Sequence, residues 1–369
     1  MYIIAADVGG TKTRLAFANA DDPCHVLFEA RYSSVQFDSF EPMLQTFLRD
    51  CEAAGVLIET INVDVLTLAL PGLVSDSIAR LTNLPWVINK QSLKDRFGFH
   101  TVRFMNDFQA SAFGTSQLQE KDKIILNQGV FNVSENSGLP PENATRVAVG
   151  AGTGLGVAWA DGNQNTACAH DTEGGHIDFA PADDTQIRLL KFLQLRHSHV
   201  SYERILSGDG LVSLYCFCAD ELGEDKLAED KVAGITAQWV NEQAKKNDKA
   251  ADNALSLFVQ IYGAYIGNIA LLFKPYGGLY ITGGIAAKIL NKMQSEDFIN
   301  AYLNKGRMRT LVEQITVYLV TNERVGVLGA VSEAIKAHNE LSQQHLIQEK
   351  SLQEPQPLQQ PAAMQQVSK

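Results

Sequence analysis

The sequence has few cysteines, and their placement predicts neither a disulfide framework nor a zinc centre. Five cysteines stand in 369 residues, an odd and scattered set, and Cys216 and Cys218 have no second close pair to complete a metal site. Disulfide-rich small domains and structural zinc sites use cysteines at short, repeated spacings. We therefore expect all five thiols to be reduced, and Cys216 and Cys218 to serve as buried packing groups.

Positive charge is also scarce. The chain carries 31 Lys and Arg against 42 Asp and Glu, which gives a formal net charge of -11. A surface of that sign repels polyanions, so nucleic acid and acidic membranes are excluded as general partners. Any phosphate site in this protein must therefore be built locally, from particular side chains or backbone amides.

Long uninterrupted hydrophobic runs are absent. The N-terminal MYIIAADVGG has no basic leader and reaches Asp7 at once, so it predicts a first β-strand rather than a signal peptide. The most apolar region, residues 255–285, is interrupted by polar residues and a proline that would be costly in hydrocarbon: Gln260, Asn268, Lys274 and Pro275. Residues 254–273 (ALSLFVQIYGAYIGNIALLF) have apolar residues at helical spacing and predict a long buried helix. We expect a cytoplasmic protein with no membrane span.

What the sequence does contain is an α/β pattern used twice. Residues 3–18 (IIAADVGGTKTRLAFA) and 146–160 (RVAVGAGTGLGVAWA) each read as a β-hairpin with a glycine-rich turn, followed by further strands and helices. With 45% hydrophobic and 20% charged residues, the chain has the composition of a packed protein. Its length favours two domains, or one fold built twice.

The first glycine turn indicates a phosphate site. Gly9, Gly10 and Thr11 follow a strand, and glycines let backbone amides converge into a nest that binds phosphate oxygens without net positive charge. Asp7 precedes this turn, and a carboxylate facing phosphates requires a cation between them, so we assign it to Mg²⁺, held through water. The alternative is a tight hairpin that needs glycine only for its backbone conformation.

Two further glycine elements follow. The turn at 150–156 fails the GxGxxG spacing because Leu155 occupies the third glycine position and a strand follows, which disfavours a dinucleotide-binding fold. GGLYITGGIAAKIL then runs from a strand into a helix at Gly283 and Gly284. No Walker A loop or protein-kinase signature is present. Three glycine elements in this order indicate a nucleotide held across a cleft.

Candidate catalytic and sugar-binding residues lie between these elements. Asn106 and Asp107 follow a strand and precede a helix, so they fit either a plain helix cap or a general base for an attacking hydroxyl. The segment 173–179 (EGGHIDF) gathers polar groups that suit a sugar, although a solvated loop or a structural histidine would also explain it. Glu203 lies on an expected helix that Ser201 would cap.

These motifs together resemble one family. ADVGGT, TNLPW, NDF, VGAGTGLGVA, EGGHIDFAP, SYERILSG, YITGGI and LGA occur in the order and at the spacing of the bacterial hexokinase-type glucokinases. The ROK (repressor, open reading frame, kinase) sugar kinases instead carry a cysteine-rich zinc segment after their histidine motif, and nothing comparable follows His176. The resemblance covers nearly the whole chain.

The resemblance implies the fold and the reaction. The fold would be the actin-like ATPase or hexokinase fold, two ribonuclease H-like α/β halves flanking a cleft, and the reaction the ATP-dependent phosphorylation of D-glucose to glucose 6-phosphate, the first step of glycolysis. It implies a homodimer, Asp107 as base toward the 6-hydroxyl, and glucose contacts from Asn106, Asp107, Glu173, His176 and Glu203. The ATP site would be lined by Gly9, Gly10, Thr11, Gly152, Thr153, Gly283 and Gly284.

We divide the chain accordingly into a small domain, residues 1–113 with 324–340, and a large domain, residues 114–323. Residues 341–369 are rich in Gln and Pro, and we expect them to be disordered. Two rival functions remain open, namely a kinase for another hexose and a non-catalytic protein on the same fold, either a sugar-sensing regulator or an actin-like assembly protein.

Overall fold

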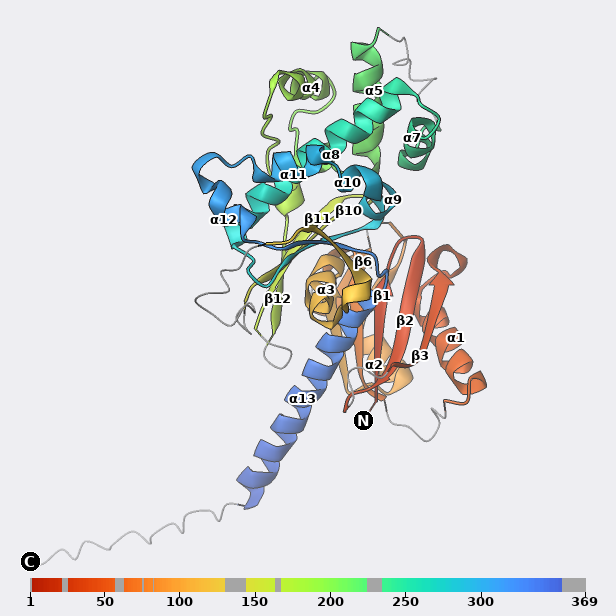
Figure 1. Ribbon diagram of the computed structural model, residues 1–369. Coiled ribbons are helices and arrows are strands. Elements are labelled where there is room, and N and C mark those ends of the chain that lie inside the picture. Colours follow the sequence, from red (N-terminus) through yellow and green to blue (C-terminus); the bar gives the residue numbers. More distant parts are fainter. Residues whose placement is uncertain are drawn as a thin grey trace, which may run out of the picture.

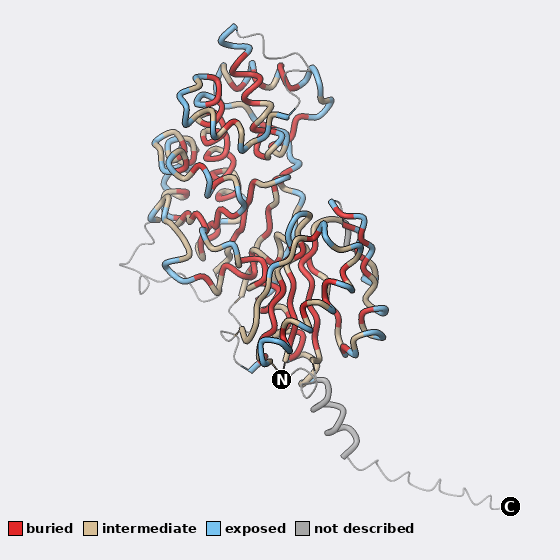
Figure 2. Tube along the Cα trace, turned by 90° about the vertical axis from the view of Figure 1, so that its right-hand side faces the viewer, coloured by how far each residue is buried: buried red, intermediate tan, exposed pale blue. Residues whose placement is uncertain are grey.

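The protein consists of two α/β blocks, each built around its own sheet (Figure 1). Buried positions concentrate in the strands of both sheets and in the helices that cover them (Figure 2). The computed structural model describes residues 2–21, 26–56, 63–74, 76–81, 83–129, 144–162, 167–223 and 234–353.

The first block is a five-stranded sheet in the order β3-β2-β1-β4-β8. Its central strands are almost wholly buried, because α1 (Phe40–Ala53) covers one face and the C-terminal helix α13 (Val325–Gln353) the other. A small sheet of β5 (Gly72–Val74), β6 (Ile78–Leu81) and β7 (Val87–Asn89), followed by α2 (Lys90–Phe97), completes the block. The main strands are β1 (Tyr2–Val8), β2 (Lys12–Asn19), β3 (Val26–Ser33), β4 (Val63–Leu70) and β8 (Thr101–Asn106).

The second block repeats that plan. Its six-stranded sheet has the order β12-β11-β10-β13-β14-β9. The antiparallel hairpin β10-β11 lies beside the parallel strand β13, just as the hairpin β1-β2 lies beside the parallel strand β4. The predicted duplication of one α/β plan is therefore confirmed. The strands are β9 (Lys123–Asn127), β10 (Arg146–Ala151), β11 (Leu155–Asp161), β12 (Cys168–Thr172), β13 (Leu279–Thr282) and β14 (Val317–Val320).

A long buried helix, α8 (Lys249–Phe273), is the centre of the helical layer over the second sheet (Figure 1). It is long and apolar enough to cross a membrane, but 67% of its most apolar window is buried inside the protein, as the core role predicted for it requires. Around it lie α4 (Asp184–Gln194), α5 (Gly208–Glu221), α7 (Ala237–Ala244), α9 (Gly284–Lys288), α10 (Leu290–Met293), α11 (Glu296–Leu303) and α12 (Arg309–Glu313).

The two blocks meet where α3 (Asp107–Gly114) crosses α13. Glycines let the helix backbones touch: a Cβ at Gly114 would lie 2.0 Å from the Val325 carbonyl oxygen, and one at Gly329 only 1.7 Å from that of Ala110. Since α3 also packs on β11, it contacts both blocks and fixes the residues at its own start between them.

The C-terminal prediction needs a correction. Residues 341–353 continue α13, which extends away from the body as a single helix, so the expected disordered tail does not begin at residue 341 (Figure 1). Gln, Leu, Glu and Lys are good helix formers, and no proline or glycine interrupts the chain before Pro355. Residues 354–369 lie outside the described residues.

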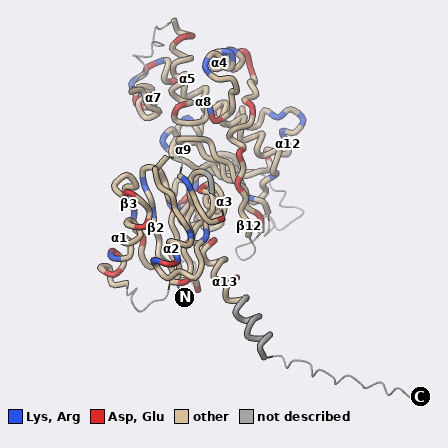
Figure 3. Tube along the Cα trace, turned by 180° about the vertical axis from the view of Figure 1, so that it is seen from behind, with Lys and Arg blue, Asp and Glu red and all other residues tan. Residues whose placement is uncertain are grey.

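The two sheets are built from separate stretches of the chain. The domain boundaries remain a prediction, with the first sheet built from strands before residue 107 and the second from strands between 123 and 320. Cys51, Cys216 and Cys218 are free and buried and Cys168 is free and exposed, whereas Cys24 lies outside the described residues. Basic and acidic positions intermingle over both blocks in the view of Figure 3.

Candidate active site

Two adjoining cavities lie where the glycine turns of both blocks approach each other, and they share Asp107, Phe108 and Gly283 in their walls. The larger has a volume of about 630 Å³ and is lined by Gly9, Gly10, Pro71, Gly72, Asn83, Asn106, Asp107, Phe108, Gly152, Thr153, Gly154, Leu155, Gly156, Thr172, Glu173, His176, Glu203 and Gly283. The smaller, of about 420 Å³, is lined by Asp7, Asp107, Phe108, Ser111, Thr282, Gly283, Gly284, Ala287, Lys288, Val320, Thr321, Asn322, Glu323, Val325 and Gly326.

Asn106 caps α3 and thereby orients the residue that follows it. Its Oδ1 accepts hydrogen bonds from the N–H groups of Phe108 (2.8 Å) and Gln109 (3.2 Å), while the Gln109 side chain accepts from the Asn106 N–H (3.2 Å). This reciprocal capping box satisfies exposed backbone donors at the helix start. Asn106 is therefore the cap of the predicted pair, and it also lines the larger cavity.

Asp107 is the first residue of α3 and lies on the wall between the cavities. Its Oδ1 accepts a hydrogen bond of 2.9 Å from the Phe108 N–H, which holds the carboxyl group in place. Burial raises the pKa of the Asp107 carboxyl, and the backbone N–H groups of Phe108 and Asp107 itself oppose that rise. A carboxylate with a raised pKa in a cavity wall is suited to accept a proton.

Asp7 is the penultimate residue of β1 and lines the smaller cavity. Burial, and then the charge of Asp107, raises the pKa of the Asp7 carboxyl to about 7, while the neighbouring Arg14 guanidinium opposes this. Gly326 lies directly against the carboxylate, because a Cβ there would be 2.5 Å from Asp7 Oδ2. The start of α13 therefore closes this side of the cavity around Asp7.

The first glycine turn is held by a buried residue that the sequence analysis did not identify. Ser34 donates its hydroxyl to the Gly9 carbonyl (2.7 Å) and its N–H to the Thr11 carbonyl (2.9 Å), and its Oγ lies 2.9 Å from Thr13 Oγ1. The turn itself closes with a bond of 3.0 Å from the Gly9 N–H to the Lys12 carbonyl. A serine distant in sequence gives no local signal of such a role.

The second and third glycine elements touch each other. A Cβ at Gly283, which has φ +86°, would lie 2.5 Å from the Ala151 carbonyl oxygen. The second turn is also tied to the start of α5, whose Gly208 N–H donates to the Gly152 carbonyl at 2.8 Å. These contacts require glycine at 283 and bring two predicted nucleotide turns to one edge of the second sheet.

Glu173, His176 and Glu203 converge on the larger cavity from two short 3₁₀ turns, Gly174–His176 and Tyr202–Arg204. His176 Nε2 lies 3.8 Å from both Glu173 Oε2 and Glu203 Oε1. Glu203 Oε2 accepts a hydrogen bond of 2.9 Å from the Leu155 N–H, which leaves its other oxygen toward the histidine. The predicted helix at Glu203 is a single 3₁₀ turn. Ser201 precedes this turn as predicted, but its side chain makes no capping hydrogen bond.

The structure gathers most of the predicted site residues and adds others. Every predicted glucose contact lines the larger cavity, and the predicted nucleotide residues line one or both cavities except Thr11. Side chains that the sequence analysis did not assign are Pro71, Asn83, Thr172, Ser111, Lys288 and Asn322. Asn83 and Lys288 fall within motifs quoted above, but nothing in those motifs marks them as site residues. The positions of the other four depend on which loops meet.

Comparison with known proteins gives the family. A sequence model described as Glucokinase matches residues 4–337. The glucokinase of Nostoc punctiforme is 34% identical over 352 residues, covering 89% of this chain and 97% of the relative. That of Hahella chejuensis is 34% identical over 336 residues, covering 91% and 97%.

Solved structures agree in fold. The crystal structure of a glucokinase from an Antarctic psychrotroph has a TM-score of 0.77 and 27% identity, and the match covers 92% of this chain and 99% of that one. A ROK family glucokinase from Streptomyces griseus, in complex with glucose and AMPPNP, matches with a TM-score of 0.57 and 21% identity over 90% and 99% of the two chains, a likeness of fold alone. The chain described here belongs to the glucokinase family.

Proposed function

We propose that the two cavities together hold the substrates of the ATP-dependent phosphorylation of glucose that family membership assigns to this enzyme. Glucose would lie in the larger cavity, and the triphosphate end of ATP would extend from the smaller cavity to the glycine turns in the wall of the larger one. The observation that carries this proposal is the position of Asp107 in the wall that both cavities share. A base at that boundary reaches the hydroxyl of a sugar on one side while the γ-phosphoryl group approaches from the other.

Glucose would be bound by the amide of Asn106, the carboxylates of Asp107, Glu173 and Glu203, and the His176 ring. Carboxylates and an imidazole can accept from and donate to several sugar hydroxyls at once. Asp107 would take the proton of the glucose 6-hydroxyl while the oxygen of that hydroxyl attacks the γ-phosphorus. The bond between the γ-phosphorus and the oxygen that bridges it to the β-phosphate would break. The products would be glucose 6-phosphate and ADP.

The nucleotide would be held mainly by backbone amides. Gly9 to Thr11 from one block, and Gly152, Thr153, Gly283 and Gly284 from the other, would supply them, which suits a protein of net charge -11. Lys288, a cation in the wall of the smaller cavity, would add positive charge near the phosphates.

The residues present also fit Mg²⁺. Among the described residues no group of three or more His, Cys, Asp or Glu could hold a metal ion by itself, and Mg²⁺ prefers one or two carboxylates together with water and substrate phosphates. Asp7 supplies such a carboxylate in the wall of the smaller cavity, where burial and the charge of Asp107 raise its pKa and a bound cation would favour its charged form. When bound, the ion would neutralise phosphate charge, and Asp7 would hold it through water.

The finer family assignment is also part of this proposal: a member of the actin-like ATPase superfamily, outside the ROK group. Its support is the duplicated sheet plan and the lack of a cysteine-rich segment after His176 in the sequence.

Closure of the blocks around glucose would expel water and suppress ATP hydrolysis. We further propose a cytoplasmic location and a homodimer. Light scattering of the purified protein would check the dimer.

A coupled assay of ADP release with Mg-ATP and a panel of hexoses tests the function. Glucose should give the highest kcat/KM, and omission of the sugar should leave only slow ATP hydrolysis. Preference for mannose, fructose or an N-acetylated amino sugar would instead identify a kinase for another hexose. Sugar binding without turnover would indicate a regulator, and the absence of both would contradict the proposal.

A further inference from the structure

We propose that Tyr265, a buried residue of α8 outside both cavities, is a positioning residue that sets the spacing of the two sugar-binding turns and thereby the affinity for glucose. The inference rests on the proposed glucose site. Tyr265 lines neither cavity, so its effect on glucose would pass through the backbone that it holds.

The hydroxyl of Tyr265 holds the first turn. It donates a hydrogen bond of 2.8 Å to the carbonyl of Gly174, the residue between Glu173 and Gly175. From the opposite side, the Gly174 N–H donates to Thr172 Oγ1 at 3.1 Å. Gly174 is therefore fixed through both its backbone groups, and the side chains of Glu173 and His176 project from a peptide with little freedom.

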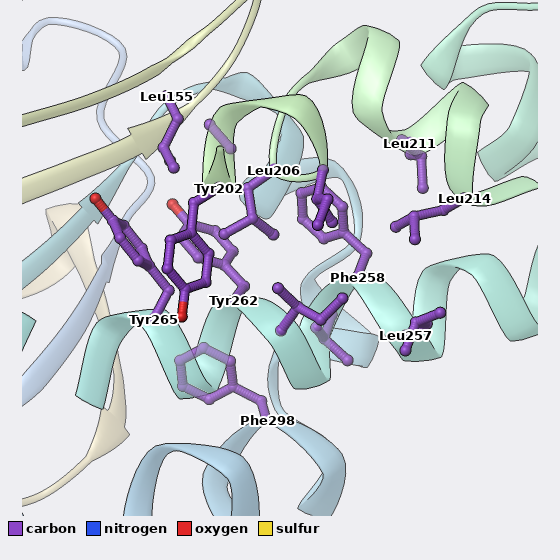
Figure 4. Close-up of a cluster of buried hydrophobic side chains, with 14 of the residues drawn as sticks. Leu155, Tyr202, Leu206, Leu211, Leu214, Leu257, Phe258, Tyr262, Tyr265 and Phe298 are labelled. Carbon is purple, nitrogen blue, oxygen red and sulfur yellow. The ribbon is translucent and has the colours of Figure 1, made fainter. Parts of the chain in front are cut away.

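The ring of Tyr265 supports the second turn. Its centroid lies 4.5 Å from that of Tyr202, the neighbour of Glu203, and Figure 4 shows the two side chains next to each other above α8. The Tyr202 hydroxyl in turn accepts from Asn268 Nδ2 at 3.2 Å, so a second residue of α8 holds this ring.

The two turns are also joined directly. The Tyr202 N–H donates to the Ile177 carbonyl at 3.1 Å, and the Phe179 N–H to the Val200 carbonyl at 3.0 Å. Tyr265 contacts both turns, Gly174 of the first with its hydroxyl and Tyr202 of the second with its ring. Because α8 is a continuous helix buried in the hydrophobic core of the second block, it serves as a rigid base for Glu173, His176 and Glu203.

Tyr265→Phe tests this role, since it keeps the ring on Tyr202 and removes only the bond to Gly174. We expect the KM and the Kd for glucose to rise roughly 5-fold to 10-fold, as expected for one lost hydrogen bond, while kcat and the KM for ATP stay within about 2-fold. Direct glucose titration without nucleotide separates binding from turnover.

The matched control is Tyr302→Phe. Tyr302 is buried in the same block and donates an equivalent hydrogen bond of 2.7 Å to the Val312 carbonyl, but it lines neither cavity. Both variants should lower the melting temperature to a similar extent, and only Tyr265→Phe should weaken glucose binding. Equal shifts in glucose affinity for the two variants would overturn the proposal, as would an unchanged affinity for Tyr265→Phe.

A second variant keeps the test open if Tyr265→Phe does not fold. Thr172→Val loosens the same Gly174 from its other side, because the Thr172 hydroxyl accepts from that N–H and donates to the Val157 carbonyl at 2.8 Å. It should raise the KM for glucose in the same way, and an unchanged KM would count against the proposal. Failure of the wild-type protein to bind glucose would instead refute the proposed function.

Discussion

Asp7 and Asp107 face the same cavity of about 420 Å³ from opposite elements, the end of β1 and the start of α3, and the charge of Asp107 contributes to the raised pKa of Asp7. Two carboxylates in one desolvated site repel each other unless a proton or a cation lies between them. The repulsion between the Asp7 and Asp107 carboxylates therefore destabilises the charged form of Asp7 in the ligand-free protein.

Asp107→Asn should lower kcat by roughly 10²-fold to 10⁴-fold, because the amide keeps the shape of the side chain but cannot accept the proton. Steady-state kinetics with glucose and Mg-ATP would measure this. Asp95→Asn is the control, since Asp95 is an exposed acid of α2 that bonds to the Gln91 side chain away from the cavities. Near-normal turnover of Asp107→Asn would show that the base is another group.

The pH dependence of kcat/KM should show an acid limb above the ordinary range of an aspartate, because burial raises the pKa of the Asp107 carboxyl. The base works only when it is deprotonated, so activity should fall as the pH drops through this raised pKa. A pH-rate profile of the wild-type enzyme gives the limb. A limb at the ordinary pKa of 3.8 would conflict with a desolvated base.

Asp7→Asn should abolish activity yet stabilise the ligand-free protein at neutral pH. The pKa of Asp7 is about 7 in the folded protein against an ordinary value of 3.8, so the folded state binds the extra proton. Stability therefore falls as the pH rises through this window, and the penalty is complete above the folded pKa. Removing the charge should raise the free energy of unfolding by about 1–3 kcal/mol above neutrality.

Urea denaturation at two pH values would check this change in stability. The difference between Asp7→Asn and wild type should be largest at mildly alkaline pH and should vanish near the ordinary pKa of aspartate. Asp95→Asn again serves as the control and should change stability little at either pH. A destabilised Asp7→Asn at alkaline pH would mean that favourable contacts of the carboxylate outweigh its burial.

Gly156→Ala should lower stability and kcat, whereas Gly152→Ala should change mainly the KM for ATP. A Cβ at Gly156 would lie 2.0 Å from the Phe108 ring, so alanine should displace the start of α3, cost on the order of 1–3 kcal/mol and reduce kcat. A Cβ at Gly152 meets nothing within 4 Å, so this variant should fold normally and raise mainly the KM for ATP. Melting temperatures and both KM values would distinguish these outcomes, and an unchanged KM for ATP in Gly152→Ala would remove this turn from the nucleotide site.

Glu203→Gln should raise the KM for glucose more than Glu173→Gln. The Glu203 side chain is 30% exposed and fixed by the Leu155 N–H, whereas that of Glu173 is 89% exposed. Charge-assisted hydrogen bonds are stronger where water is excluded. Glucose KM values for both variants decide the matter, and a wild-type KM in each would refute the binding role of these carboxylates.

The sequence by itself determined the local elements. Glycines at 9, 10, 150 and 283, set between apolar runs, predicted strands joined by tight turns, because that residue permits turns and close approaches. The Asn106-Asp107 pair between a strand and a helix gave the start of α3. Apolar residues at helical spacing predicted the long core helix α8. The Gln-rich composition of residues 341–353 hid their helical propensity.

Only the tertiary structure decided which of these pieces meet. Ser34 holds the Gly9 turn, Phe108 fills the space above Gly156, and Tyr265 reaches Gly174 across 91 positions of sequence. None of these partners has a local motif, because a hydrogen bond to a distant backbone carbonyl needs only a hydroxyl at the right point in space. The raised pKa values of Asp7 and Asp107 arise in the same way, from burial and proximity that the folded chain creates.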